Sequence, residues 1–374
     1  MKEPRVSQPD KTKNIRPQAI GRRGFLLTAS AAIMFAADAH AGPFAGRARP
    51  LAGRLGRSTG GDGAVKTIDN VSLTDPSRGR TFLVRAYYPA AAGTYPTIVF
   101  SHGFGADMSA FEQTSRDWAA KGYVVIHPTH ADSVRHPDPA APSGGRTALL
   151  GAIMSQRTAK PGRPRPGTGG NNALVNVLED PFYLKSRLAD ISFIVGLLDA
   201  GSGIDSALHA RVKRGTYGMA GHSYGAYTTE VLAGARLSTP ERNPSPSLMA
   251  KFSTFMAISG QGSGRLDLTA DSFGAIGKPF FAITGTEDTG ANGETPEWRL
   301  EPYYKCAPGN KFAAVVRGFN HMSFDSDGEG SEALRAMQLE FWDAWLGGKW
   351  QAGNQLLATA KSSTSADTVW LRTR

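Results

Sequence analysis

The sequence predicts an α/β protein with a mostly parallel sheet, helices on both faces and an N-terminal antiparallel hairpin. Short continuous apolar runs recur along the chain, and segments with helical spacing separate them, which is the pattern of parallel strands joined by crossover helices. The first two runs, 97–101 and 123–126, enclose a helix-length segment, 108–121, that ends at Gly122. A strand, a helix and a second strand in this order form a βαβ unit.

Two segments upstream of these runs, 65–73 and 80–88, alternate apolar with polar side chains. The turn-forming segment 75–79, Asp-Pro-Ser-Arg-Gly, separates them. This arrangement predicts an antiparallel hairpin at the edge of the sheet. We therefore place the globular domain at residues 64–374.

The first 41 residues have the pattern of an export signal. Arg22 and Arg23 precede a modest apolar run, 25–37, that is too short to span a bilayer. Ala-His-Ala at 39–41 then gives a small-x-small cleavage pattern. The segment resembles a twin-arginine signal, so we expect the twin-arginine export machinery to carry a folded protein to the periplasm or the medium. The alternative is a disordered basic N-terminus followed by a buried helix.

The linker at 42–63 is rich in Gly, Arg, Ala and Pro and has little to bury. The formal net charge of the chain is +10, and seven basic and three acidic side chains at 1–41 account for +4 of it. Such a charge affects solubility and steering. No nucleic-acid-binding motif accompanies it, so we expect no nucleic-acid partner. Cys306 is the only cysteine, which excludes an intrachain disulfide.

The segment 131–176 interrupts the strand and helix pattern. It holds many Pro and Gly residues, with six basic and two acidic side chains. Long insertions in compact enzymes often serve as lids, so a lid-like role is one expectation and a solvated excursion is the other. At its start, histidines and aspartates crowd together and suggest an alternative metal site; they are His127, His130, Asp132, His136 and Asp138.

Beyond the insertion, 180–200 carries apolar residues at helical spacing, and its Arg187 and Asp190 are expected to pair with each other. Four later segments complete the pattern as three strands and a closing helix; they are 252–258, 279–284, 312–316 and 331–346.

The stretch Gly221-His222-Ser223-Tyr224-Gly225 lies between a strand-like and a helix-like run. A serine on such a sharp turn has a strained backbone, and small residues two positions away on each side let the strand and helix pass closely. The turn also leaves the Tyr224 N–H at a helix start, where it can bind a developing oxyanion. This is the sequence form of a nucleophile elbow, with Ser223 as the nucleophile.

A serine nucleophile needs a base and a group that orients the base, and the usual chain order in this architecture is nucleophile, acid, histidine. Of eight histidines, His321 alone lies well beyond Ser223, and it follows the last predicted strand. Asp288, which also follows a strand, is our choice for the acid. Its neighbour Glu287 and Asp267, after the preceding strand, remain alternatives.

A second oxyanion donor is expected after the first central strand. Residues 101–105 read Ser-His-Gly-Phe-Gly, a tight loop in which the Phe104 N–H can complete the hole with that of Tyr224. His102, His130 and His222 follow or adjoin strand ends, so they are candidates for the lining of a substrate pocket.

These motifs together resemble the α/β-hydrolase superfamily over about residues 64–347. Within it the chain resembles the exported branch related to dienelactone hydrolases, platelet-activating-factor acetylhydrolases and cutinase-like polyesterases. The resemblance implies an α/β-hydrolase fold and a triad of Ser223, Asp288 and His321. Two differences separate the chain from these relatives: dienelactone hydrolases use a cysteine nucleophile, and cutinase-like polyesterases lack an insertion like 131–176.

The predicted function is therefore hydrolysis of carboxylic esters through an acyl-enzyme, without a cofactor or metal. A small-molecule or lipid-like ester is the expected substrate, and no membrane span is expected after signal removal. Acyl transfer or peptide hydrolysis by the same triad is the alternative. A metal-binding or non-catalytic binding protein on a hydrolase scaffold is a further one.

Overall fold

The computed structural model describes residues 63–142, 144, 147 and 169–374. Every described residue belongs to a single compact unit. The expected signal at 1–41, nearly all of the expected linker at 42–63 and about half of the insertion at 131–176 lie outside the described residues. Within the described part, no helix is long and apolar enough to cross a membrane.

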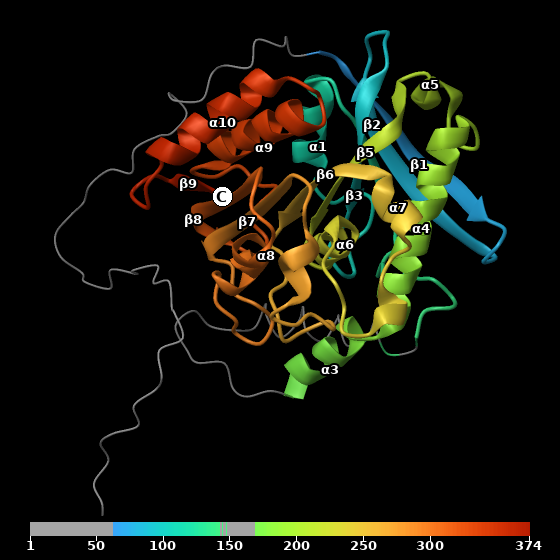
Figure 1. The fold of residues 1–374 in the computed structure, drawn as a ribbon. Coiled ribbons are helices and arrows are strands. Elements are labelled where there is room, and N and C mark those ends of the chain that lie inside the picture. The colour runs from blue at the N-terminus through green and yellow to red at the C-terminus, as the bar shows by residue number, and fades with distance from the viewer. Residues whose placement is uncertain (1–62, 143, 145–146, 148–168) are drawn as a thin grey trace, which may run out of the picture. The chain divides into compact units, whose positions relative to one another are not determined.

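One nine-stranded sheet, in the order β1-β2-β4-β3-β5-β6-β7-β8-β9, organises the domain (Figure 1). Strands β3 to β8 are mutually parallel, whereas β1, β2 and β9 join the two ends of the sheet in antiparallel pairs. The strands are β1 (Val65–Asp75), β2 (Arg80–Pro89), β3 (Tyr95–Ser101), β4 (Val124–Pro128), β5 (Val212–His222), β6 (Phe252–Ile258), β7 (Phe280–Glu287), β8 (Lys311–Asn320) and β9 (Val369–Thr373).

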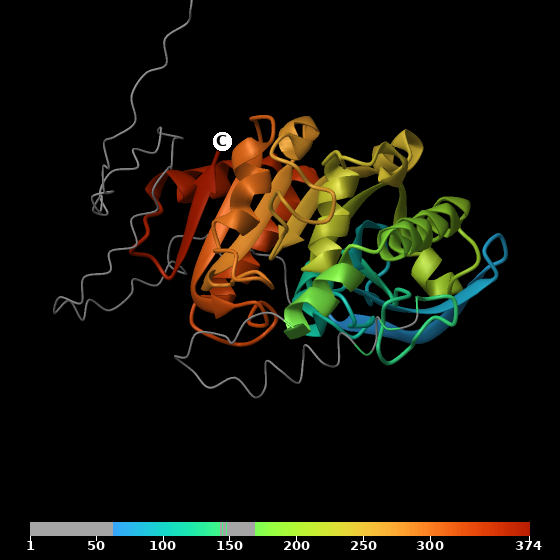
Figure 2. The same ribbon diagram turned by 90° about the horizontal axis from the view of Figure 1, so that it is seen from below.

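Helices cover the sheet on both faces, as the two views show (Figures 1 and 2). On one face α1 packs against α9, with the ring centroids of Trp118 and Trp342 5.5 Å apart. On the other face α4 and α6 lie in contact. The α-helices are α1 (Glu112–Ala120), α3 (Gly169–Leu178), α4 (Pro181–Ala200), α5 (Ser206–His209), α6 (Tyr224–Ala233), α7 (Pro246–Ala250), α8 (Glu301–Lys305), α9 (Ser331–Trp345) and α10 (Trp350–Ser362). Short 3₁₀ turns occupy Pro240–Arg242, Ser272–Ala275 and Trp298–Leu300.

The fold class predicted from the sequence is confirmed, including the edge hairpin and the six parallel strands. The helix predicted over 108–121 is shorter, because Phe111 adopts a left-handed conformation, with φ of 58°, immediately before α1. Six of the described α-helices and strands were not predicted from the sequence; they are the helices α3, α5, α7, α8 and α10 and the strand β9. Strand β9 adds to β8 at the end of the sheet, and its short apolar run, Val369–Leu371, is the signal that could have located it.

Candidate active site

The nucleophile elbow joins β5 to α6. Ser223 has φ of 56° and ψ of −115°, a strained conformation of the kind found where structure is held in place for function. A Cβ added at Gly221 would overlap the backbone of Gly225, and a Cβ added at Gly225 would overlap the carbonyl oxygen of Ser101. Both glycines are therefore required by the close approach of β5, α6 and the end of β3.

Because this approach leaves no room for a methyl group, Gly225→Ala is expected to prevent stable folding or to lower Tm by about 2–10 °C. Overpacking of a core costs roughly 1–3 kcal/mol or more, and here the clash is with backbone. Gly196→Ala is the matched control, because a Cβ at Gly196 within α4 meets nothing within 4 Å. That control should raise stability by about 0.5–1 kcal/mol. Thermal melts of both variants measure the difference, and an unchanged Tm for Gly225→Ala would contradict the elbow packing.

Ser223, His321 and Asp288 come together from three neighbouring loops at the carboxyl edge of the sheet. The His321 Nε2 lies 3.0 Å from Ser223 Oγ, and its Nδ1 lies 3.0 Å from Asp288 Oδ1. The rival Asp267 lies elsewhere, with its carboxylate against Arg242 and Ser238. Glu287, at the end of β7, is exposed. The geometry thus groups the serine and histidine with the aspartate chosen from the sequence.

Asp288 is buried and satisfied by several donors. Besides His321, its carboxylate accepts hydrogen bonds from Ser259 Oγ and Thr284 Oγ1, each at 3.0 Å, and Arg299 Nε lies 2.9 Å from Oδ1. Burial alone would raise the pKa of Asp288, but the hydrogen bond from His321 and the Arg299 charge outweigh it, so the pKa is lowered. The carboxylate is therefore ionised at neutral pH and can hold an imidazolium.

Sequence reasoning missed Ser259 and Arg299. The Ser259 Oγ lies 2.8 Å from His321 Nδ1, and Arg299 Nη2 lies 3.3 Å from the same nitrogen. Arg299 also donates to the carbonyl oxygens of Ser259 and Gly260 at 3.1 and 3.0 Å. It thereby ties the loop after β6 to the loop that carries Asp288. No motif marks either residue, although Ser259 directly follows β6 at the edge where active-site loops gather.

The predicted oxyanion donors lie beside the nucleophile. Among the described residues, neither the Phe104 N–H nor the Tyr224 N–H has a hydrogen-bond acceptor. The ring centroids of the two residues are 5.4 Å apart. A Cβ built at Gly103 would lie 3.5 Å from Ser223 Cβ. This places the loop of residues 102–105 against the elbow, where two free donors suit a developing oxyanion.

The three histidines predicted to line a substrate pocket are buried in the protein interior. His102 and His130 have no exposed surface, so the expectation that they line an accessible pocket is corrected. The His130 N–H donates to His102 Nε2 at 2.9 Å, and His130 Nε2 lies 3.0 Å from Ser101 Oγ. His222 is also buried, and its Nε2 donates to the His321 carbonyl oxygen at 2.9 Å. All three side chains therefore make hydrogen bonds inside the protein, next to the active-site loops.

The five residues of the alternative metal site do not converge. His127 lies against Ser115, with 2.8 Å between Nε2 and Oγ, His130 binds Ser101 and Asp190, and His136 is exposed. Within the described ranges, no group of three or more metal-ligating side chains could hold an ion.

The expected pairing of Arg187 with Asp190 is wrong. Arg187 instead forms a two-pronged ion pair with Asp132, while Asp190 accepts from Arg80 Nε at 2.9 Å and lies 3.0 Å from His130 Nδ1. Both side chains lie on the buried side of α4, where each meets a different loop. Helical spacing identifies neighbours on the helix, but it carries no information about partners brought in by tertiary packing.

Four buried histidines should make the protein sensitive to acid. Burial lowers the pKa of each, to about 4 in His130 and to about 3 in the other three, His102, His127 and His222. An unfolded histidine titrates near 6.5. Between about pH 4 and 6.5 the unfolded chain therefore binds protons that the folded chain excludes, and stability falls as the pH falls.

The buried Glu230 and the half-buried Glu340 act in the opposite direction, because desolvation raises the pKa of each. On unfolding near pH 5, the chain should therefore take up a net of about two protons. The free energy of unfolding should then change by about 3 kcal/mol per pH unit. Urea unfolding at several pH values measures this slope. His127→Gln should reduce it by about one proton, because the unfolded chain then has one fewer imidazole to protonate. A slope that is flat between pH 4 and 6.5 would contradict the prediction.

Comparison with known proteins agrees with this architecture. Residues 80–136 match the family model of platelet-activating factor acetylhydrolase, isoform II. The match covers β2 through the residues after β4, including the loop of residues 102–105, and it ends before Ser223. A search of curated proteins found no match. The match and the sheet together show a chain of α/β-hydrolase type that resembles this esterase family, and they support a serine ester hydrolase in general terms.

Proposed function

We propose that this α/β-hydrolase is an exported serine esterase that cleaves carboxylic esters through Ser223, His321 and Asp288. The observation that carries the proposal is the continuous contact from Ser223 Oγ through the His321 ring to Asp288, with 3.0 Å at each step. The two acceptor-free N–H groups beside Ser223 complete the set of parts that acyl transfer needs.

In the proposed first half-reaction, Ser223 Oγ attacks the ester carbonyl carbon and its proton passes to His321 Nε2. Asp288 accepts a hydrogen bond from Nδ1–H and stabilises the imidazolium that forms. The N–H groups of Phe104 and Tyr224 bind the oxyanion. The tetrahedral intermediate then collapses, and the alcohol leaves with the proton from His321. An acyl group remains bound to Ser223.

In the second half-reaction, His321 takes a proton from water, whose oxygen attacks the acyl carbon. Collapse of this second intermediate returns the proton to Ser223 Oγ and releases the acid. Each proton and each electron pair moves between groups of this chain, the ester and water.

Export belongs to the same proposal. The paired Arg22 and Arg23, the apolar run at 25–37 and the small-x-small pattern at 39–41 support passage through the twin-arginine machinery. The active protein would then work in the periplasm or the medium, on small or lipid-like esters that reach it there.

Hydrolysis of p-nitrophenyl esters from acetate to palmitate tests the function, and the profile over chain length measures the acyl site. We expect hydrolysis in water without added metal. Cleavage of p-nitroanilides with none of esters would instead favour a peptidase. Consumption of ester that requires an added alcohol acceptor would favour an acyltransferase. Failure on every substrate would overturn the proposal.

A further inference from the structure

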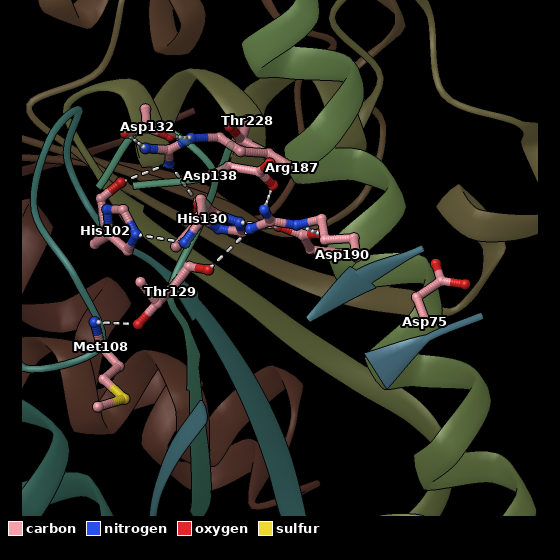
Figure 3. A network of polar contacts seen from close by, with 12 residues as sticks. Asp75, His102, Met108, Thr129, His130, Asp132, Asp138, Arg187, Asp190 and Thr228 are labelled. Carbon is pink, nitrogen blue, oxygen red and sulfur yellow. Dashed lines mark hydrogen bonds and ion pairs between the residues drawn. The ribbon is translucent and has the colours of Figure 1, made fainter. Parts of the chain in front are cut away.

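A buried ion pair between Arg187 and Asp132 lies beside His102 (Figure 3). Arg187 comes from α4, and Asp132 follows β4 at the start of the insertion. Arg187 Nε and Nη2 lie 3.0 and 2.7 Å from the two oxygens of Asp132. Neither side chain has any exposed surface. The remaining polar atoms of a fully buried ion pair need hydrogen-bond partners within the protein.

Those remaining atoms hold the loop of residues 102–105 from both sides of Phe104. Arg187 Nη1 donates to the His102 carbonyl oxygen at 2.6 Å. Asp132 Oδ2 accepts from the Gly105 N–H at 2.8 Å. One member of the pair thus fixes the backbone two residues before Phe104, and the other fixes it one residue after.

The peptide between Gly103 and Phe104 is oriented within this frame. The Gly103 oxygen accepts from His102 Nδ1 at 2.7 Å and from the Ala106 N–H at 3.1 Å. The carbonyl and N–H of a trans peptide point in opposite directions. The Phe104 N–H therefore points away from these two donors. It lies on a loop whose Gly103 is packed against Ser223.

The same ion pair also contacts the second donor residue. The Arg187 guanidinium lies over the Tyr224 ring, 4.9 Å from its centroid, which is close enough for a cation–π contact. Tyr224 is buried at the start of α6. Arg187 thus contacts Tyr224 directly and reaches Phe104 through the backbone of His102, two residues before it.

We propose that Arg187 and Asp132 are positioning residues that hold the two oxyanion donors in place before substrate binds. The proposal rests on the proposed esterase function and adds a role for residue 132 of the insertion. An ion pair that only supports the fold would contribute stability without favouring the transition state over bound substrate. A pair that positions the donors acts on the transition state selectively.

The test replaces both partners at once, as Arg187→Met with Asp132→Leu, so that no buried charge is left unpaired. Replacement of a buried ion pair by apolar residues of similar size often leaves the free energy of unfolding unchanged or raises it. The expected result is a fall in kcat of about 10- to 100-fold with KM changed less than about twofold. This is smaller than the 10²- to 10³-fold loss known for complete removal of an oxyanion donor. Affinity for a trifluoromethyl ketone, which forms a tetrahedral adduct on the serine, should fall by the same factor as kcat/KM.

Arg335→Met with Asp117→Leu is the control, because this partly exposed ion pair joins α9 to α1 and shares no element with Arg187 or Asp132. Its kcat should stay within twofold of wild type. If the first double variant does not fold, Arg187→Lys replaces it, because lysine keeps the charge but lacks the planar fork that binds both oxygens of Asp132 and also reaches the His102 carbonyl. It should show the same selective loss of kcat.

An unchanged kcat in a folded variant would overturn the positioning role, as would a loss of kcat/KM without weaker ketone binding. Both results would leave the esterase function standing, since wild-type activity that depends on Ser223 is measured beside them. Absence of ester hydrolysis in the wild type would overturn both proposals together.

Discussion

Replacement of Ser223 with alanine is expected to lower kcat for p-nitrophenyl ester hydrolysis by about 10⁶-fold, the scale of nucleophile removal in serine hydrolase triads. The reason is that, in the proposed mechanism, the hydroxyl 3.0 Å from His321 Nε2 supplies the attacking oxygen. Phe104 and Tyr224 would still bind an oxyanion, so a residual acceleration of about 10³–10⁴ over water should survive.

This variant should fold normally, because only an oxygen atom is removed from a half-buried side chain. Thermal melts establish this, and Ser247→Ala, at an exposed position, controls for a serine change elsewhere. A fluorophosphonate probe should label the wild type at Ser223, as located by peptide mass spectrometry, and leave the alanine variant unlabelled. Ester hydrolysis that persists at more than about one per cent of wild type in the folded variant would show that another group attacks the ester.

Ser223 and His321 could be predicted from the sequence, because local sterics or the order of the segments leave few alternatives for each. The spacing of Gly221, Ser223 and Gly225 reflects a local steric requirement, and the strained backbone at Ser223 agrees with it. His321 could be selected because the other histidines precede or adjoin Ser223. In both cases the constraint is contained in a short segment or in the order of segments.

The groups that hold these residues in place could not be found in this way. Arg299 binds six backbone and side-chain groups around Asp288 and His321, and these partners come from segments far apart in the sequence. Arg187 was assigned the wrong partner because helical spacing was the sole information available. Buried polar side chains choose partners in three dimensions, and a single sequence records residue types without those pairings.

The choice between Asp288 and Asp267 also depends on tertiary structure, and one pair of variants decides it chemically. Asp288→Asn is expected to lower kcat by about 10⁴-fold, because an amide cannot stabilise the imidazolium and favours the wrong tautomer of His321. Asp267→Asn is the matched control. Its carboxylate contacts Arg242 near the surface, so kcat should remain within about twofold of wild type.

Stability must be measured beside the rates, because Asp288→Asn also leaves the buried Arg299 without its charged partner. Breaking such a buried pair costs about 3–5 kcal/mol, whereas loss of the half-exposed partner of Arg242 should cost less than about 1 kcal/mol. Assays at a temperature where both variants are folded, as shown by their melts, separate the catalytic effect from the stability effect. A loss of kcat for Asp267→Asn as large as for Asp288→Asn would refute the assignment of the acid. Full activity of folded Asp288→Asn would do the same, because the carboxylate that contacts His321 would then have no part in the reaction.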